Sequence, residues 1–357
     1  MRVVIVILLL LITLEGAEEK LGGQIVVDRV WIEGDDVDTQ GGEIRRARLS
    51  LQGKITPKLE YEIEYSFTGK NRWKDVNIEY QALSNLGIQA GNIKEPIGLE
   101  ALISSKNSTF MERSMVHTFM QKRKLGVVVS GSYVDGIHHG TVTFGIFGKS
   151  LDKLFAKKRD GTSLIGRLTY ALVHSKENLV HVGASAGETK YHAKSMKYST
   201  DAGSHLYSGS LIKSKIKNVT KTKRVGLETA VVKGSFSFQG EYVALNAFNK
   251  KNSYEFDGWY GQVSFFLTGE HRKYKVKTAK FSRTKIKKHA LQVAFRASKI
   301  RLQDKKHHPR EEVDLTLAFN YYFKKNIRLM SSYTFAEVME PSILKEHVFQ
   351  VRGLYGF

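Results

Sequence analysis

Two neighbouring stretches decide the fold: residues 44–52 read IRRARLSLQ, and residues 59–67 read LEYEIEYSF. In the first, apolar residues alternate with arginines and small polar residues. In the second, Leu, Tyr, Ile and Phe alternate with three glutamates and a serine. Because successive side chains of a strand point to opposite faces of a sheet, each stretch predicts a β-strand with one apolar and one charged face.

The two stretches predict an antiparallel hairpin that turns through residues 53–57. The register that we expect sets Arg46 opposite Glu64 and Arg48 opposite Glu62 on the charged face. Opposite charges on neighbouring strands stabilise a sheet, whereas an arginine facing lipid would cost roughly 2–4 kcal/mol at mid-bilayer. This sorting favours lipid against the apolar face and water against the charged face.

The same alternation recurs in sixteen segments. They are residues 24–31, 44–52, 58–67, 75–82, 86–94, 124–131, 140–148, 163–172, 179–187, 224–232, 235–245, 256–268, 288–301, 312–323, 326–336 and 346–357. Strands that cross a bilayer at a tilt need ~9–11 residues, and bacterial outer-membrane barrels have even strand numbers. We expect an all-β, sixteen-stranded antiparallel transmembrane β-barrel. A soluble β-sandwich is the alternative. The Tyr and Phe residues near strand ends count against it, because they suit the aromatic girdle of a membrane barrel.

The composition excludes several classes of protein. The chain has 357 residues, no cysteine, and 56 Lys+Arg against 35 Asp+Glu, a formal net charge of +21. The lack of cysteine removes disulfides, Cys-based zinc sites, iron–sulfur clusters and a thiol nucleophile. After the first fifteen residues, no apolar run approaches the ~20 residues that a membrane-spanning helix needs.

The N-terminus has the pattern of a secretory signal. A basic start is followed by an almost purely aliphatic stretch at residues 3–14 and by small residues at Gly16 and Ala17. We expect residues 1–17 to be a signal peptide and residues 18–357 to be the barrel domain. A buried N-terminal strand or helix is the alternative.

The C-terminal segment alternates as well. Phe349, Val351, Tyr355 and Phe357 share one phase, with Arg352 in the other. An aromatic last residue resembles the C-terminal recognition signal of outer-membrane barrels. We therefore expect Phe357 to be recognised by the barrel-assembly machinery.

The connections alternate between short and long. With both ends of the chain in the periplasm, residues 53–57, 83–85, 233–234 and 324–325 are expected as periplasmic turns, and residues 95–123, 149–162, 188–223 and 302–311 as outer loops. Short periplasmic turns and long outer loops are typical of such barrels. Residues 269–287 break this rule, because they form a long connection on the periplasmic side.

Several motifs resemble the phosphate-selective porin O and P family. They are EIRRARL at residues 43–49, KEPIGLE at 94–100, SSK at 104–106, TFMERS at 109–114, FLTGEHR at 266–272 and NIRLM at 326–330. The segment from 94 to 114 is the most specific, and the matches follow one another from residue 43 towards the C-terminus.

The resemblance implies a trimeric, sixteen-stranded porin with an anion-selective constriction. Residues 95–123, 188–223 and 269–287 would then fold into the lumen, the first as the constriction loop. The matching positions assign Ser105, Lys106 and Arg113 to phosphate binding in the inward loop. They assign Arg45, Arg46 and Arg48 to basic strand positions near the constriction.

Strand phase adds candidates from the residues themselves. The arginines that should point inward are Arg46, Arg48, Arg167, Arg296 and Arg328. Rings of Arg or Lys select anions in pores, and a guanidinium fork fits phosphate oxygens. The plainer interpretation is that Arg46 and Arg48 neutralise Glu64 and Glu62, and Arg113 lies next to Glu112.

Other chemistry has weaker support. The lysine-rich stretches at 149–159, 213–224 and 273–288 are typical of nucleic-acid binders, but an exported chain favours lipopolysaccharide binding or anion steering. Ser104-Ser105-Lys106 has no second catalytic motif, and His138-His139 and His307-His308 lack a third ligand at metal spacing. We expect no enzyme activity, no cofactor and no metal.

The sequence thus predicts a Gram-negative outer-membrane porin, a homotrimer by family resemblance, that passes phosphate or polyphosphate by passive diffusion. A general or weakly selective porin is one alternative, since Glu60, Glu62, Glu64, Glu79 and Glu241 also face the lumen by phase. A structural or adhesive barrel with basic outer loops is the other.

Overall fold

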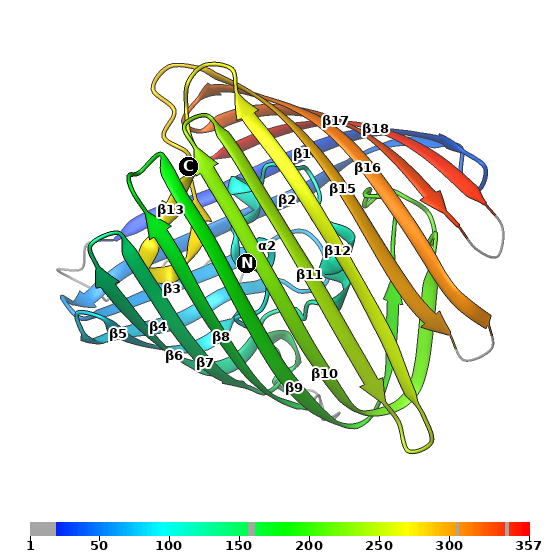
Figure 1. Cartoon of the computed structure of the whole chain (residues 1–357), viewed down its shortest axis with the longest axis horizontal. Helices are drawn as coiled ribbons and strands as arrows, with labels where there is room; N and C mark the ends of the chain where they lie inside the picture. Colours follow the sequence, from blue (N-terminus) through cyan, green and yellow to red (C-terminus); the bar gives the residue numbers. More distant parts are fainter. Residues whose placement is uncertain (1–18, 156–160, 305–306, 340–342) are drawn as a thin grey trace.

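The computed structural model describes residues 19–155, 161–304, 307–339 and 343–357. Within these residues, sixteen antiparallel strands form a closed barrel (Figure 1), which confirms the expected fold. They are β1 (Lys20–Gly34), β2 (Thr39–Thr56), β3 (Leu59–Ser66), β4 (Trp73–Leu83), β5 (Leu86–Ile93), β6 (Lys124–Asp135), β7 (His138–Phe147), β8 (Thr162–Val173), β9 (Asn178–Ser199), β10 (Lys213–Lys233), β11 (Phe236–Phe248), β12 (Ser253–Phe266), β15 (Ala290–Asp304), β16 (His307–Lys324), β17 (Ile327–Val338) and β18 (Leu344–Gly356). The expected signal peptide, residues 1–17, lies outside the described residues.

The first and last strands close the barrel. β1 pairs antiparallel with β18, so that Trp31 lies opposite Phe349 and Asp28 opposite Arg352. In Figure 1 these strands, blue and red, run side by side. Closure gives each strand two hydrogen-bonded neighbours and leaves no free sheet edge, as hydrocarbon surroundings require.

The two faces of the wall differ in the expected way. On β7 and β8, the exposed outward side chains include Phe144, Leu164 and Leu168, whereas Arg167 and Thr169, on either side of Leu168, are buried inside. The period-two pattern therefore places apolar side chains towards lipid and polar side chains towards the interior.

The expected register of the first hairpin is wrong by four residues. β2 continues through residues 53–56 and turns at residues 57–58, so Arg48 lies opposite Ser66 and Gln52 opposite Glu62. The longer ladder adds cross-strand hydrogen bonds that the five-residue turn would have lost. An even shift keeps each side chain on its expected face, so the sorting of charge is unchanged.

Two expected outer loops are mostly strand. The span 188–223 is the extended ends of β9 and β10 with a tip at residues 200–212, and the span 302–311 continues β15 and β16. In the first span, exposed lysines alternate with buried residues such as Ser214 and Ile216. The lysines give the segment a loop-like composition, but their spacing is that of a strand.

Three connections lie inside the barrel, as expected for inward-folded loops: residues 94–123, the connection after β12, and the hairpin end between β9 and β10. Residues 94–123 contain the short helices α2 (Leu99–Leu102), η1 (Ser105–Asn107) and η2 (Met115–Phe119). The connection after β12 contains the small two-stranded sheet of β13 (Lys273–Lys275) and β14 (Lys280–Ser282), with η4 (Val276–Thr278) between them. A further short helix, η3 (Leu151–Lys153), follows β7. Among the described residues, no helix has the length and apolar character to cross a bilayer.

The β9–β10 hairpin reaches across the lumen to the far wall. Its buried residues, among them Tyr198, Tyr207 and Ile212, pack in one apolar cluster with wall residues such as Phe256 and Val348. At the tip, the carbonyl oxygen of Gly203 accepts a hydrogen bond of 3.0 Å from Gln350 on β18. This cluster fills one side of the lumen and leaves open space beside β2 to β5.

Candidate functional site

Arginines of the barrel wall hold the 94–123 connection across the lumen. Their donated bonds run from Arg328 to the carbonyl oxygen of Ser108 (2.9 Å), from Arg296 to that of Glu112 (3.0 Å) and from Arg352 to that of Met111. A hydrogen bond with one charged partner contributes about 1.5–3 kcal/mol. Three such bonds within five loop residues fix the position of the segment.

A second set of contacts fixes the start of the connection. Gly98 has φ +77°, and a Cβ at this position would lie 2.8 Å from Oε2 of Glu241. The same Glu241 carboxylate accepts the backbone N–H of Glu100 at 2.6 Å. The Glu100 carboxylate in turn accepts the N–H and hydroxyl of Ser114, at 3.1 and 2.7 Å. Glycine is needed here both for its backbone conformation and for the lack of a side chain.

A basic cavity of about 830 Å³ lies on the long-loop side of this connection. Its basic lining residues are Arg45, Arg46, Arg48, Lys70, Lys74, Lys94, Arg113, Lys122 and Arg123, and its acidic ones are Glu43, Glu95 and Asp152. Nine cationic side chains thus face three carboxylates among the described lining residues. A confined lining of one predominant sign raises the local concentration of the opposite ion.

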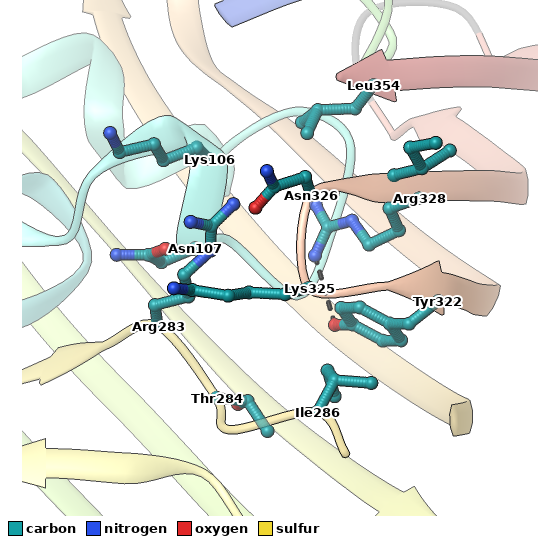
Figure 2. Close-up of a pocket in the computed structure, with 11 residues that line it drawn as sticks. Lys106, Asn107, Arg283, Thr284, Ile286, Tyr322, Lys325, Asn326, Arg328 and Leu354 are labelled. Atoms are coloured by element: carbon teal, nitrogen blue, oxygen red, sulfur yellow. Dashed lines mark hydrogen bonds between the residues drawn. The ribbon is translucent and has the colours of Figure 1, made fainter. Parts of the chain in front are cut away.

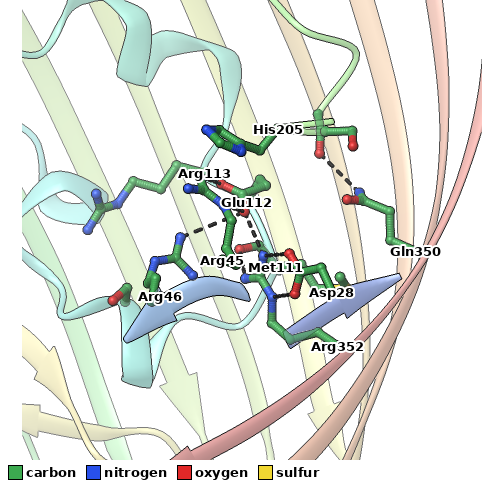
Figure 3. Close-up of polar contacts among 12 residues, drawn as sticks. Asp28, Arg45, Arg46, Met111, Glu112, Arg113, His205, Gln350 and Arg352 are labelled. Carbon is green, nitrogen blue, oxygen red and sulfur yellow. Dashed lines mark hydrogen bonds and ion pairs between the residues drawn. The ribbon is translucent and has the colours of Figure 1, made fainter. Parts of the chain in front are cut away.

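One loop carboxylate lies among the arginines of this cavity (Figure 3). Glu112 accepts hydrogen bonds of 3.0 Å from Arg45 on both oxygens, and one of 2.6 Å from Arg352. A terminal nitrogen of Arg46 is 3.7 Å away. Burial acts to raise the pKa of Glu112, but the three guanidinium groups outweigh it and hold the pKa well below its usual range. Glu112 is therefore an anion supplied by the chain itself.

A β-bulge lets two consecutive arginines reach the same carboxylate. Val26 pairs with Arg46 and Val27 with Ile44, so Arg45 is the extra residue in β2. A bulge interrupts the alternation of side chains and redirects one of them. Arg45 and Arg46 consequently both point into the barrel, which a regular strand would not allow.

Two half-buried cations, Lys94 and Arg113, line the cavity on the side of the connection. Arg113 donates to the carbonyl oxygen of Ile103 at 2.8 Å and lies 3.2 Å from Nε2 of His117. Lys94 donates to the carbonyl oxygens of Ala101 and Ile103, at 2.7 and 3.1 Å. Burial, followed by the charge of Arg113, lowers the pKa of Lys94 and of His117 well below their ordinary values. An entering anion would relieve this repulsion.

Other cations of the cavity have carboxylate partners. Arg48 binds Glu64 at 3.0 Å, and Arg123 binds Asp75 at 2.5 Å. The expected pairing of Arg46 with Glu64 and of Arg48 with Glu62 is wrong, because the register shift moves Glu64 next to Arg48. Glu62 accepts a hydrogen bond of 2.8 Å from Gln52 instead.

A second basic recess lies at the short-turn end of the barrel (Figure 2). Its lining includes Lys106 from the inward connection, Arg283 from the connection after β12, and Lys325 and Arg328 from the β16–β17 turn and β17. Arg328 donates to the hydroxyl of Tyr322 at 3.1 Å. Within the described chain, none of the four cations forms an ion pair with a carboxylate. Burial, then the charge of Arg328, lowers the pKa of Arg283.

The expected site residues therefore divide among different places. Arg45, Arg46, Arg48 and Arg113 line the large cavity, and Lys106 and Arg328 line the recess at the other end. Ser105 accepts a hydrogen bond of 3.3 Å from Gln24 on β1. The remaining two arginines line neither space. Arg296 holds the 94–123 connection, and Arg167 pairs with Glu228 and donates to the carbonyl oxygen of Ala279 at 2.8 Å.

Several cations at the site were not among the expected residues, including Lys94 and Arg123 of the cavity lining and Arg352, which binds Glu112. Arg352 stands in the inward phase of the last strand, so phase alone could have added it to the list. Lys94 opens the most specific motif, whereas Arg123 is the last residue of the long connection and carries no local signal. No group of three or more His, Cys, Asp or Glu residues suited to a metal ion occurs in the part of the chain that is described.

Comparison with known proteins places these features in a family. The family model described as phosphate-selective porin O and P matches residues 20–340. Porin O of Pseudomonas aeruginosa is 25% identical over 329 residues, which cover 80% of this chain and 73% of that protein.

Solved structures share the fold at low sequence identity. An anion-selective porin from Comamonas acidovorans aligns with a TM-score of 0.64 and 10% identity, covering 96% of this chain and 100% of that one. The trimer form of OmpT, an outer-membrane protein of Vibrio cholerae, aligns with a TM-score of 0.59 and 11% identity over the same shares.

Proposed function

The chain belongs to the phosphate-selective porin O and P family and is a Gram-negative outer-membrane porin rather than an enzyme, and we propose that it conducts small anions, with phosphate or polyphosphate as substrate. Movement would be passive, down the concentration gradient. The observation that carries the proposal is the excess of cationic over acidic side chains around the cavity beside the 94–123 connection.

The proposed path has two basic binding sites. An anion entering from outside would meet the large cavity, where Arg46, Arg113 and Lys94 offer charge and hydrogen bonds. It would then pass the inward connection and reach the periplasmic recess of Lys106 and Arg283. Conduction requires sites that bind strongly enough to attract an ion and weakly enough to release it. Anions in series along such sites would exchange between them.

Chloride conductance in a planar bilayer tests the proposal. A salt gradient gives the ion preference through the reversal potential, and added phosphate should block chloride current. The variant that combines Lys106→Ala with Arg113→Ala should lose most of this block. A reversal potential that favours cations would reject anion conduction, and an unchanged block would remove these two residues from the phosphate site.

A weakly selective porin is the second candidate, because several cavity arginines are already neutralised by Glu112, Glu64 and Asp75. The same recordings separate the two. A strong anion preference with phosphate block supports the phosphate-selective channel, and a preference near unity supports the general porin.

We propose further that the chain forms a homotrimer through the outer face of β1 and β2. Arg29 is exposed on that face between the apolar Val27 and Trp31, and it donates to Gln40 at 2.8 Å. An arginine facing lipid costs roughly 2–4 kcal/mol at mid-bilayer, so cover by a neighbouring subunit would remove a penalty. The trimer form of the Vibrio cholerae neighbour supports this assembly.

A further inference from the structure

The outer face of β9 and β10 changes from apolar to basic between two successive outward-facing residues of β10. Across the neighbouring strands, Val225 lies opposite Ala186 and Ala244. The next outward residue of β10, Lys223, lies opposite Glu188 and Asn246, and Lys221 follows opposite Lys190 and Phe248. Val225 and Leu227 are exposed on the lipid side. The apolar band therefore ends between positions 225 and 223, on the extracellular side.

The three lysines beyond this boundary outnumber the one carboxylate beside them, that of Glu188. Lys221 and Lys190 are direct cross-strand partners, and like charges in that position destabilise a sheet. A carboxylate oxygen of Glu188 is 4.0 Å from Lys190. Among the residues that the structure describes, no carboxylate forms an ion pair with Lys221 or Lys223. The ammonium group of Lys221 lies 5.0 Å from the centre of the Phe248 ring.

On the neighbouring strands β12, β15 and β16, outward charges at comparable cross-strand positions form ion pairs within the chain. The row of Val225 and Ala244 continues to Asp257 and Arg301, which form an ion pair of 2.6 Å. Lys299, two positions earlier on β15, binds Glu311 at 2.7 Å. These outward cations of β15 thus each have a carboxylate partner, whereas the three lysines of β9 and β10 have only Glu188 beside them.

We propose that Lys190, Lys221 and Lys223 bind the phosphate groups of lipopolysaccharide in the outer leaflet. Basic clusters at a membrane boundary recognise anionic lipid head groups, and lysine side chains extend along apolar surface to place their charge at the interface. Here the exposed Val225 and Leu227 lie on the membrane side of the lysines, where acyl chains would lie. The phosphates supply the negative charge that the sheet lacks.

The position of the cluster in the barrel suits a lipid rather than a subunit. β9 and β10 stand on the opposite side of the sixteen-stranded ring from β1 and β2, and β1–β2 is the face assigned above to subunit contact. The cluster would consequently point away from the trimer axis. This inference rests on the outer-membrane location of the porin and does not depend on its ion preference.

Binding of purified lipopolysaccharide to the detergent-solubilised protein tests the site. We expect the triple variant Lys190→Gln, Lys221→Gln, Lys223→Gln to bind at least tenfold more weakly than wild type. The matched control replaces Lys213, Lys215 and Lys217 of the same strand by Gln. It removes equal charge from the end of the β9–β10 hairpin that reaches across the lumen. Its affinity should equal that of wild type.

A second arm uses the wild-type protein alone, so the test does not depend on how the variants fold. Enzymatically dephosphorylated lipopolysaccharide should bind as weakly as the triple variant binds the intact lipid, and inorganic phosphate should not displace the intact lipid. Equal affinity for intact and dephosphorylated lipid would overturn the proposal. So would wild-type affinity in a triple variant whose heat-dependent gel mobility shows that it is folded. Displacement by free phosphate would assign the lysines to inorganic anions instead.

Discussion

Arg45 and Glu112 form a two-point ion pair inside the barrel, with both hydrogen bonds 3.0 Å long. A guanidinium fork binds a carboxylate and a phosphate through the same pair of parallel donors. The side chain of Glu112 therefore holds a position among Arg45, Arg46 and Arg352 that a permeant anion could use. On this basis we expect the inward connection to influence anion affinity as well as the shape of the lumen.

Glu112→Gln should strengthen phosphate binding. The amide keeps the size of the side chain but removes its negative charge, so Arg45 and Arg46 gain net positive charge towards a passing anion. We expect half-block of chloride current at a phosphate concentration lower by roughly three- to tenfold, on the order of 1 kcal/mol. Glu112→Asp, which keeps the charge, is the control and should remain near wild type. Equal phosphate block in the Gln variant and wild type would argue against competition.

Anion preference should decrease with rising pH through Lys94. Its pKa is lowered well below 10.5 by burial and by the charges of Arg113 and Arg123. Lys94 carries charge below this lowered pKa and loses it as the pH rises through it, so anion attraction is present at low pH and weakens as pH increases. Chloride serves as the probe because it does not titrate. The measurement is the reversal potential as a function of pH.

Two substitutions at position 94 isolate this effect. Lys94→Met should remove the pH-dependent step, and Lys94→Arg should keep a high anion preference at alkaline pH. A wild-type preference that stays constant across the range, or a step that persists in the Met variant, would assign the pH dependence to other groups.

Arg296→Met should loosen the inward connection. The wild-type side chain is buried, donates to the carbonyl oxygen of Glu112 at 3.0 Å and lies 4.5 Å over the ring of Phe110. Loss of this charged bond removes about 1.5–3 kcal/mol of local anchoring. We expect larger current fluctuations and faster proteolysis within residues 95–123. Arg301→Met, which removes an outer-face ion pair with Asp257, is the control and should leave both readouts unchanged.

Arg29→Leu should weaken the trimer without unfolding the barrel. Leucine is compatible with lipid at this outward position, but it cannot make the polar contacts that a subunit interface would provide. We expect a shift from trimer towards monomer in light scattering of the detergent-solubilised protein, with heat-dependent gel mobility retained. Lys233→Leu, on the outer face of β10, should not change the assembly. A trimer of unaltered stability in the Arg29 variant would place the interface elsewhere.

The strands were predictable because their signal is local. Alternation between neighbours identifies a strand and its inward face without any knowledge of the partner strand. The register of the first hairpin was not predictable in this way, since a shift by four residues returns each side chain to the same face. Alternation therefore accepts the expected partner of Arg48, Glu62, and the observed residue, Ser66, equally well.

The partners of the site arginines depend on contacts between distant parts of the chain. Phase correctly placed Arg167, Arg296 and Arg328 inside the barrel, but it could not show that they bind inward segments. Arg45 illustrates a further limit, because only the bulge opposite Val26 and Val27 turns it inward. Sequence patterns thus identify the cations that face the interior, whereas tertiary packing decides which of them an anion can reach.

The seam between β1 and β18 joins residues from the two ends of the chain, as in the pairing of Trp31 with Phe349. The cylinder consequently cannot be completed until nearly the whole polypeptide has been delivered to the site of insertion. A chain cut short before β18 would leave β1 and β17 each with unpaired backbone groups, a state that hydrocarbon does not tolerate. Loss of the last dozen residues would therefore be as damaging to biogenesis as loss of a whole strand from the middle of the wall.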